Sequence, residues 1–338
     1  MAGDQASSSG SSPEQVDSLP AAGVQGRDAV ASLSLTTADL PALFTNSDYT
    51  AVSAQRRFLG MTRLRLILLV AAAVAGAAAV AGAVTINWFG FVGAALLLTA
   101  AIIELDILRD RPDRRWYEGR AAAESAKTLG WRYAVGGAPF ALGAMPEHET
   151  DRLLIDRLEE ILTDLGDLSF DPRHSAAEQI TPAMRAMRAI SLDDRKAVYE
   201  SGRIQDQIDW YSSNSARNER QARRLTLAVL AFEVLGAVGG LLHAFESDLP
   251  AINALGVAAA AAAALGAWLQ AKQHQTVARA YAVAALELSS IRSLIRWQRT
   301  EADWANFVDE AETAISREHT LWRANRGMRP AARPPKLG

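Results

Sequence analysis

The sequence contains no cysteine, only five histidines, and only four lysines among its 35 basic residues. Without cysteine there is no disulfide framework, no thiolate metal site and no thiol nucleophile. None of the histidines lies in an HExxH zinc motif, and the GxxxxGK[ST] and GxSxG patterns are also missing. We therefore predict no catalytic residues, no metal site and no cofactor, and we expect a protein that is not an enzyme.

Neither sign of charge is in excess, because 35 basic residues face 38 acidic ones and the net charge is −3. This balance gives no reason to expect a nucleic-acid partner. The mean hydropathy of +0.01 averages two strongly apolar blocks with a polar remainder. The first apolar run begins near Leu64, too late for a cleaved signal peptide. We expect internal segments that insert into a lipid bilayer.

Each apolar block is long enough for two transmembrane helices, since one crossing needs about 20 apolar residues. The first block predicts spans at about 64–85 and 88–108, separated at Thr85-Ile86-Asn87. The second predicts spans at about 225–245 and 251–271, separated by Glu246-Ser-Asp-Leu-Pro250. A soluble alanine-rich core helix is the alternative for 251–271, but four apolar runs in two matched pairs favour two transmembrane hairpins.

Basic residues flank the outer ends of both blocks and are missing from the two short turns. Basic residues mark the cytoplasmic ends of membrane helices, so both hairpins are predicted to insert in the same direction. Both chain ends and the polar middle segment would then lie in the cytoplasm. The flanking residues are Arg56, Arg57, Arg63, Arg65, Arg109, Arg111, Arg114, Arg115, Arg217, Arg220, Arg223, Arg224, Lys272 and Arg279.

The polar remainder is predicted to be helical between two disordered tails, 1–44 and 327–338. Start signals occur at Thr181-Pro182 and at Ser191, and a stop signal occurs at Gly136-Gly137-Ala-Pro139. The helix that begins after Ser191 is predicted to run continuously into the third span over roughly 80 Å, and a break near Ser212-Ser213 is the alternative. The other predicted helices cover 113–133, 147–165, 272–304 and 309–323.

The predicted plan is an all-α integral membrane protein made by tandem duplication. Each unit combines a polar helix, a transmembrane hairpin and a second polar helix, and its long helical extensions pair as antiparallel stalks. The first unit covers 45–145, a helical connector covers 146–194, and the second unit covers 195–326.

Two kinds of residue in the predicted spans are candidates for function. Glu233 lies near the centre of the third span, where an ionisable group faces either an aqueous path or a hydrogen-bonding partner. Glu104 lies closer to the membrane boundary and is the second pore-lining candidate. Small residues at four-residue spacing let helices approach closely, either within a hairpin or between copies. These packing candidates are Gly236 and Gly240, Gly76 with Ala72, and Gly266 with Ala262.

The stretches beside the hairpins carry a recognisable set of polar and aromatic residues. After the first hairpin come Trp116-Tyr-Glu-Gly-Arg120-Ala-Ala-Ala-Glu124-Ser-Ala-Lys127, Trp131-Arg-Tyr133 and Pro139-Phe140. Before the second come Arg203-Ile-Gln-Asp-Gln207-Ile-Asp-Trp210-Tyr211, Asn214, Ala216 and Asn218. The chain then continues with Tyr281, Ala284-Ala285, Leu286 to Arg292, Glu318-His319 and Trp322. These stretches resemble two types of SLATT domain, over about 45–145 and 195–325.

The resemblance implies a bacterial two-helix membrane domain that acts as a pore-forming effector in anti-phage conflict systems. It implies a homo-oligomer in the bacterial inner membrane, triggered through the cytoplasmic helices or through a sensor or nucleotide-signal partner. The chain departs from the simplest form of the family because it has two units and no recognisable sensor domain. A membrane scaffold that recruits a cytoplasmic machine is one alternative. A small proton-coupled transporter is another, although it requires inverted repeats, which the arginine pattern disfavours.

Overall fold

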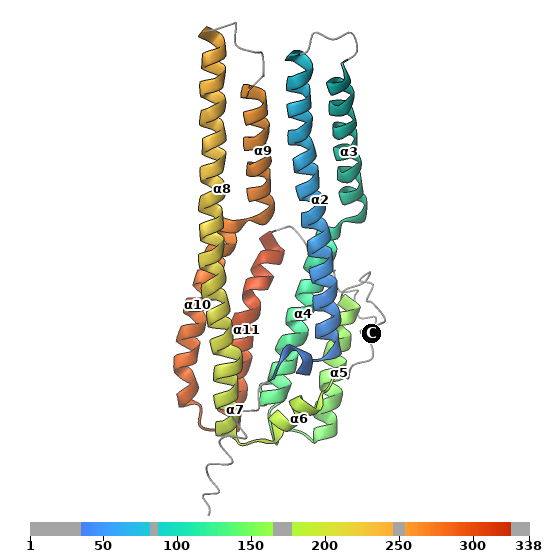
Figure 1. Cartoon of the computed structure of the whole chain (residues 1–338). Helices are drawn as coiled ribbons and strands as arrows, with labels where there is room; N and C mark the ends of the chain where they lie inside the picture. Colours follow the sequence, from blue (N-terminus) through green and yellow to red (C-terminus); the bar gives the residue numbers. More distant parts are fainter. Residues whose placement is uncertain (1–34, 82–86, 165–177, 246–253, 326–338) are drawn as a thin grey trace, which may run out of the picture. The chain divides into compact units, whose positions relative to one another are not determined.

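The computed structural model describes residues 35–81, 87–164, 178–245 and 254–325, and all regular structure in these ranges is helical (Figure 1). The all-α prediction is confirmed. The elements are η1 (Thr37–Asp39), α2 (Ala42–Ala81), α3 (Trp88–Asp110), α4 (Pro112–Val135), α5 (Glu147–Asp164), α6 (Pro182–Ala189), α7 (Leu192–Tyr199), the π-helical η3 (Glu200–Gln205), α8 (Asp206–Phe245), α9 (Ala254–Lys272), α10 (His274–Leu294), η4 (Ile295–Trp297) and α11 (Glu301–Asn325).

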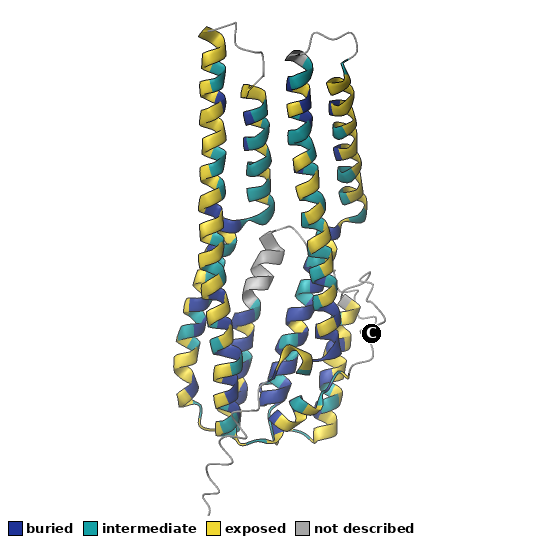
Figure 2. Cartoon of the chain, in the orientation of Figure 1, coloured by how far each residue is buried: buried dark blue, intermediate teal, exposed yellow. Residues whose placement is uncertain are grey.

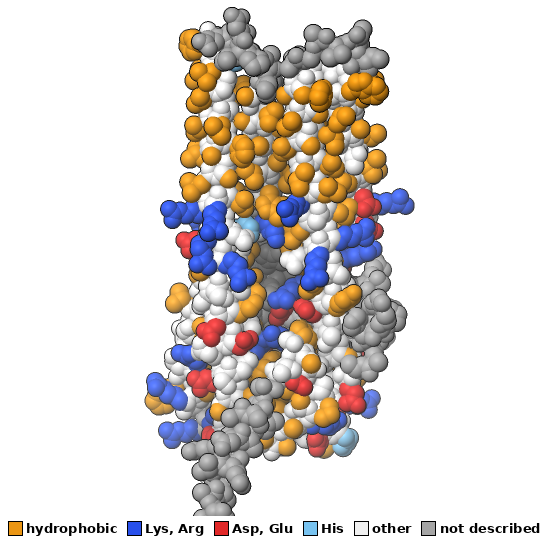
Figure 3. All heavy atoms as spheres, viewed as in Figure 1, with side chains coloured by type: hydrophobic (Ala, Val, Ile, Leu, Met, Phe, Trp, Pro, Cys, Tyr) orange, Lys and Arg blue, Asp and Glu red, His pale blue; other side chains and the backbone are white. Residues whose placement is uncertain are grey.

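Four helices are long and apolar enough to cross a membrane. Their apolar stretches lie in α2, α3, α8 and α9, where few side chains are buried (Figure 2). Helices α2 and α3 pack together, α8 and α9 pack together, and α2 contacts α9. Charged side chains gather along one edge of the apolar band (Figure 3). The protein is therefore a multi-pass membrane protein with two transmembrane hairpins, whose turns lie outside the described residues.

Both hairpins have the same backbone device where the second membrane helix ends. Arg111 follows α3 with φ 42°, and Gln273 follows α9 with φ 51°, so both adopt the left-handed conformation. Each donates its backbone N–H to a carbonyl four residues earlier, Ile107 at 3.0 Å and Leu269 at 2.9 Å. The chain then continues as α4 or α10. Positive φ is uncommon for residues other than glycine, and its repetition supports the predicted duplication.

The prediction of a continuous helix after Ser191 is confirmed, since it runs through α7, η3 and α8, and the alternative of a break at Ser212-Ser213 is wrong. The polar side chains there bond within the helix, since Ser213 Oγ and Asn214 Nδ2 both donate to the Trp210 carbonyl, at 3.0 and 2.9 Å. The single helix predicted over 272–304 is also wrong. It is interrupted at Gln273 and ends at Trp297, and Thr300 then caps α11 by accepting the Asp303 N–H at 3.1 Å.

The N-terminal tail was predicted to extend to residue 44, which is ten residues too far. Residues 35–44 are described and packed, with Leu40, Leu43 and Phe44 buried. The Leu43 N–H donates to the Gln179 side chain at 3.1 Å, and Thr181 Oγ1 donates to the Asp39 carbonyl at 2.7 Å. Residues 35–44 are therefore ordered, because their apolar side chains are buried and their backbone is bonded to residues 179 and 181. Residues 1–34 and 327–338 lie outside the described residues.

The predicted caps are confirmed. Gly136 ends α4 with φ 76°, Thr181 Oγ1 accepts the Met184 N–H at 3.2 Å, and Ser191 Oγ accepts the Asp194 N–H at 3.3 Å. Below the charged edge, α4 to α7, α10, α11 and the adjoining parts of α2 and α8 form a layer that we call the extramembrane layer (Figure 1). Its core is the main buried region of the described chain (Figure 2).

Candidate functional site

The most completely buried charges of the described chain form an ion pair within the extramembrane layer. Arg203 in η3 donates from Nε to Oε1 of Glu312 at 2.8 Å and from Nη2 to Oε2 at 2.7 Å. The side chains are only 1% and 0% exposed. Burial lowers the pKa of Arg203, but the charge and hydrogen bonds of Glu312 outweigh this effect and raise it. A paired geometry of this kind compensates the loss of hydration of both groups.

Two further side chains donate hydrogen bonds to the carboxylate of Glu312. Thr128 Oγ1 on α4 donates to Oε2 at 3.0 Å, and the Tyr199 hydroxyl on α7 donates to Oε1 at 3.1 Å. Burial and the Glu312 charge raise the pKa of Tyr199, which keeps its donor proton in place. Glu312 therefore ties α4, α7 and η3 to α11. We call Thr128, Tyr199, Arg203 and Glu312 the polar centre.

The predicted motif residues of α4 lie beside this centre. Arg120 pairs with Glu124 at 2.5 Å and with Asp48 of α2 at 3.5 Å. Lys127 lies next on the same helix. Burial lowers the pKa of Lys127, and the charge of Arg203 lowers it further, while Glu124 acts in the opposite direction. Because Glu312 accepts hydrogen bonds from both Arg203 and Thr128, the neighbour of Lys127, the motifs of the two predicted units converge on one place.

Aromatic rings enclose the polar centre. The ring of Tyr199 meets Trp131 edge-on at 5.9 Å and Trp304 at 5.5 Å between centroids. All three side chains are almost completely buried. Tyr133, from the same family motif as Trp131, is also buried in the core of this layer. Water is thereby largely kept from the ion pair, which strengthens its electrostatic interaction.

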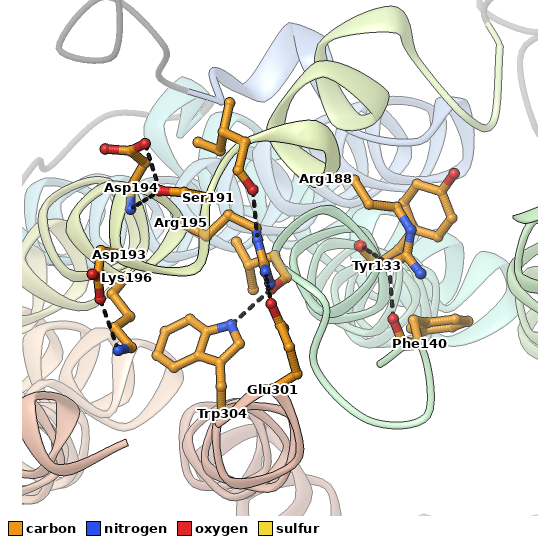
Figure 4. Close-up of polar contacts among 12 residues, drawn as sticks. Tyr133, Phe140, Arg188, Ser191, Asp193, Asp194, Arg195, Lys196, Glu301 and Trp304 are labelled. Atoms are coloured by element: carbon orange, nitrogen blue, oxygen red, sulfur yellow. Dashed lines mark hydrogen bonds and ion pairs between the residues drawn. The ribbon is translucent and has the colours of Figure 1, made fainter. Parts of the chain in front are cut away.

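The C-terminal end of α4 is held by side chains from three other helices (Figure 4). Arg188 donates to the carbonyls of Tyr133 and Phe140 at 2.9 and 2.7 Å. Arg195 and the Trp304 indole both donate to the Val135 carbonyl at 2.7 Å. The last carbonyls of a helix lack partners within it and carry partial negative charge, so cations are favourable there.

Some of the remaining motif residues are buried between helices, and others lie partly exposed at the surface. Tyr211 and Gln207 are buried, and Tyr211 packs with Ala285 and Leu288 of α10. The half-exposed Trp210 contacts Tyr281 with ring centroids 5.0 Å apart. Trp116 stacks on Tyr117 of the same helix at 4.8 Å and contacts Phe58 of α2 with ring centroids 6.3 Å apart. These residues join helices within each stalk. The side chains of Glu318, His319 and Trp322 lie outside those described.

Comparison with known families decides the assignment. Residues 41–196 match the family described as SMODS and SLOG-associating 2TM effector domain 3, and residues 199–322 match the corresponding domain 1. The chain carries two SLATT domains in tandem. It is therefore a membrane protein of the effector class. The first matched range includes residues 146–194, which the sequence analysis set apart as a connector. No curated protein and no solved structure matches the chain.

The polar centre lies where the two SLATT domains meet. Thr128 belongs to the first domain and Glu312 to the second. Arg132 of the first domain also pairs with Asp309 of the second at 2.9 Å, and Arg195 pairs with Glu301. The interface between the domains thus includes α4 against α11 in the extramembrane layer and α2 against α9 beside it.

The predicted membrane residues fall into different surroundings. Glu104 pairs with Arg65 at 3.0 Å. Glu233 is exposed on α8 and has no hydrogen bond or ion pair among the described residues. A methyl group added at Gly236 would lie 3.1 Å from Cβ of Ala258, and one at Gly240 would lie 3.5 Å from Leu255, so both face α9. The predicted packing residues Gly76 and Gly266 have open space instead.

The sequence analysis missed Glu312, Tyr199, Thr128 and the two capping arginines. A signal for Glu312 exists, because it falls at helical spacing from Trp304, Val308 and Ile315, on the buried face of α11. A lone carboxylate on an apolar face is expected to have a buried cationic partner. Arg188 and Arg195 carry no such signal, since the carbonyls that they cap, and the Glu301 carboxylate that pairs with Arg195, come near only in the tertiary fold.

Proposed function

We propose that this tandem SLATT protein is a non-enzymatic, oligomeric, pore-forming effector of a bacterial defence system, whose conduction path forms between copies of the chain. The observation that carries the proposal is the exposed Glu233 near the middle of a membrane span. An ionisable group there costs about 3 kcal/mol unless water or a partner receives it. A polar path between copies would provide that water, and the carboxylate would favour cations.

The charged edge of the apolar band supports an orientation with both chain ends in the cytoplasm (Figure 3). Basic residues from both hairpins lie on this same edge, as expected for a positive-inside insertion into the bacterial inner membrane. The two hairpins are also parallel rather than inverted. This arrangement favours a pore over a transporter built from inverted repeats.

The trigger is proposed to act on the polar centre, either through the extramembrane helices or through a cytoplasmic sensor or nucleotide-signal partner. The polar centre joins both domains, and its helices α4 and η3–α8 connect directly to membrane helices. A change in this packing would therefore be passed to both hairpins together.

The test is the ion selectivity of the full-length protein reconstituted in vesicles under a KCl gradient. Glu233→Gln is expected to reduce the cation preference, measured as a shift of the reversal potential towards zero. Glu104→Gln is the matched control, because the pairing of Glu104 with Arg65 places it at the charged edge. Unchanged conductance and selectivity in an active Glu233→Gln channel would contradict the proposal.

The oligomer requires a separate test, and the structure determines which glycines are suitable. Gly236→Leu would disturb the α8–α9 contact within one chain. Gly76→Leu and Gly266→Leu enter open space, so the chain is expected to fold while close packing between copies is lost. The membrane potential of expressing cells is measured. Depolarisation by the wild type, together with no depolarisation by either variant, would support assembly through the helix faces that carry Gly76 and Gly266.

A scaffold that recruits a cytoplasmic machine is the second candidate. It is favoured by α5, an amphipathic helix of the extramembrane layer that leaves Ile155 and Leu162 exposed. This function predicts no conductance, and it predicts loss of partner binding when 146–194 is deleted.

A further inference from the structure

A groove of about 720 Å³ lies between the two hairpins on the membrane side of the charged edge. Its walls come from three helices, with Leu66 and Val70 on α2, Phe232 on α8, and Leu265 and Trp268 on α9. These side chains are apolar, and the volume is within the range of ligand sites, about 300–1,000 Å³. The groove therefore suits an apolar ligand that reaches it from within the bilayer.

Two cations lie where the groove meets the charged edge. Arg63 lines the groove directly. The ammonium group of Lys272 lies 5.5 Å from the centroid of the Trp268 ring, which is part of the groove wall. Neither cation forms an ion pair with a carboxylate of the described chain. The groove thus has an apolar interior and an uncompensated positive rim.

The other face of α2 provides a contrast. Arg65 there pairs with Glu104 at 3.0 Å, and Arg57 pairs with Asp106 and Asp110 at 3.3 and 2.5 Å. Carboxylates of α3 thus compensate the arginines inside the first hairpin, whereas Arg63 faces the groove without one. A negative charge that would neutralise the rim has to come from outside the chain.

We propose that the groove binds one anionic phospholipid, with an acyl chain between α2, α8 and α9 and its phosphate against Arg63 and Lys272. Lipid tails are as apolar as the groove, so the acyl chain alone gives little selectivity. Selectivity for the anionic lipid comes from the headgroup, because basic residues at a membrane surface attract anionic lipids. The lipid would bridge the two SLATT domains within the membrane. This inference requires the membrane-spanning fold and does not depend on pore formation.

The experiment uses the full-length protein in vesicles of phosphatidylcholine with a minor fraction of phosphatidylglycerol that carries a photoactivatable acyl chain. Crosslinked peptides are then mapped. Labels are expected on the groove-lining parts of α2 and α9. Arg63→Gln and Lys272→Gln are each expected to reduce labelling about fivefold, the effect of removing one surface cation.

Arg65→Gln is the matched control, since it removes the same charge from the same helix but from the other face. Labelling of this variant is expected to equal that of the wild type, and photoactivatable phosphatidylcholine at the same fraction is expected to label the groove less. Equal labelling by both lipids, or an equal loss in Arg65→Gln, would overturn the proposal. The unfolding temperature of each variant is measured as a control, to establish that the substitution leaves the fold intact.

A second copy of the chain is the rival occupant of the groove. Since the native sequence has no cysteine, Ala264→Cys introduces a single thiol into the groove wall. A disulfide between copies formed through this residue in membranes would overturn the lipid proposal. A chain that stays monomeric on oxidation, together with selective labelling by the anionic lipid, would support it.

Discussion

Glu312 accepts hydrogen bonds from side chains on three other helical segments, and removing its charge should therefore have a large effect. Glu312→Gln leaves Arg203 buried without a counter-charge, which typically costs about 3–5 kcal/mol. We expect a marked fall in the unfolding temperature of the purified protein. The exposed Glu310 is two residues away on the same helix, and Glu310→Gln is expected to have almost no effect.

Replacing both members of the pair should be milder than replacing one. Nη1 of Arg203 has no hydrogen-bond partner among the described residues, so the native pair is incompletely satisfied. A buried ion pair replaced by apolar residues of similar size is often neutral in stability or better. Arg203→Met with Glu312→Met is expected to unfold near the wild-type temperature. A double variant as unstable as Glu312→Gln would show that other contacts dominate.

At the residue scale, the sequence identifies one member of the buried Arg203–Glu312 ion pair. Arg203 is named through its family motif, because its spacing from Gln207 and Trp210 is visible in the sequence. Its partner lies 109 residues further along the chain, and no local pattern connects the two. Glu104 illustrates the opposite case, since its nearness to the predicted membrane boundary already suggested an interfacial position.

The junction of α9 and α10 contains a titratable group that links the hairpin to its stalk. His274 is 5% exposed, and its Nδ1 lies 2.6 Å from Oδ1 of Asn218 on α8. Burial lowers the pKa of His274, and the charge of Lys272 lowers it further. The corner is therefore built around a neutral imidazole.

Acidification is expected to weaken this junction. The unfolded chain takes up a proton near the ordinary pKa of 6.5, whereas the folded His274 resists it until lower pH. Stability from this group is thus complete above about pH 6.5 and is lost as the pH falls through the lowered pKa. The measurement is the unfolding temperature between pH 8 and pH 5 for the wild type and His274→Gln. A difference between the two proteins that stays constant with pH would contradict this prediction.

Element boundaries were predictable where a cap or a composition change marks them. The serine and threonine caps, the glycine stop and the four apolar runs all have local causes, and the structure places helix ends there. Gln273 and Arg111 were missed because neither residue type favours a left-handed backbone. Their conformation comes from joining a membrane helix to an antiparallel stalk, which is a tertiary requirement.

At the scale of the whole molecule, the two SLATT domains should behave as one folding unit. Their interface includes the polar centre, the Arg132–Asp309 pair and the cap on Val135. We predict that a protease site inserted within 165–177 can be cut without separating the fragments, although the second fragment then carries the end of the first domain together with the whole second domain. The measurement is co-purification of the two fragments in detergent. Release of an intact C-terminal fragment would contradict the prediction.

The tandem plan was predictable from the sequence, since two apolar blocks with matched charge flanks repeat in order. The way the two units pack was not. The contact of α4 with α11 depends on helices about 180 residues apart, as the bond from Thr128 to Glu312 shows. Periodicity shows that each helix has an apolar face, and it leaves open which other helix covers that face.

The uninterrupted helix from Leu192 to Phe245 has the length of a lever that joins the extramembrane layer to the membrane. Its 54 residues extend roughly 80 Å at about 1.5 Å per residue. A rigid rod of that length pivoting by about 5° at its base displaces its far end by roughly 7 Å, which is more than one helical turn. At about 1.5 Å per residue, Arg203 lies roughly 16 Å and Glu233 roughly 62 Å from the base. The same pivot moves Arg203 by about 1.4 Å, so a small rearrangement at the buried carboxylate would correspond to a movement several times larger at the far end of the membrane helix.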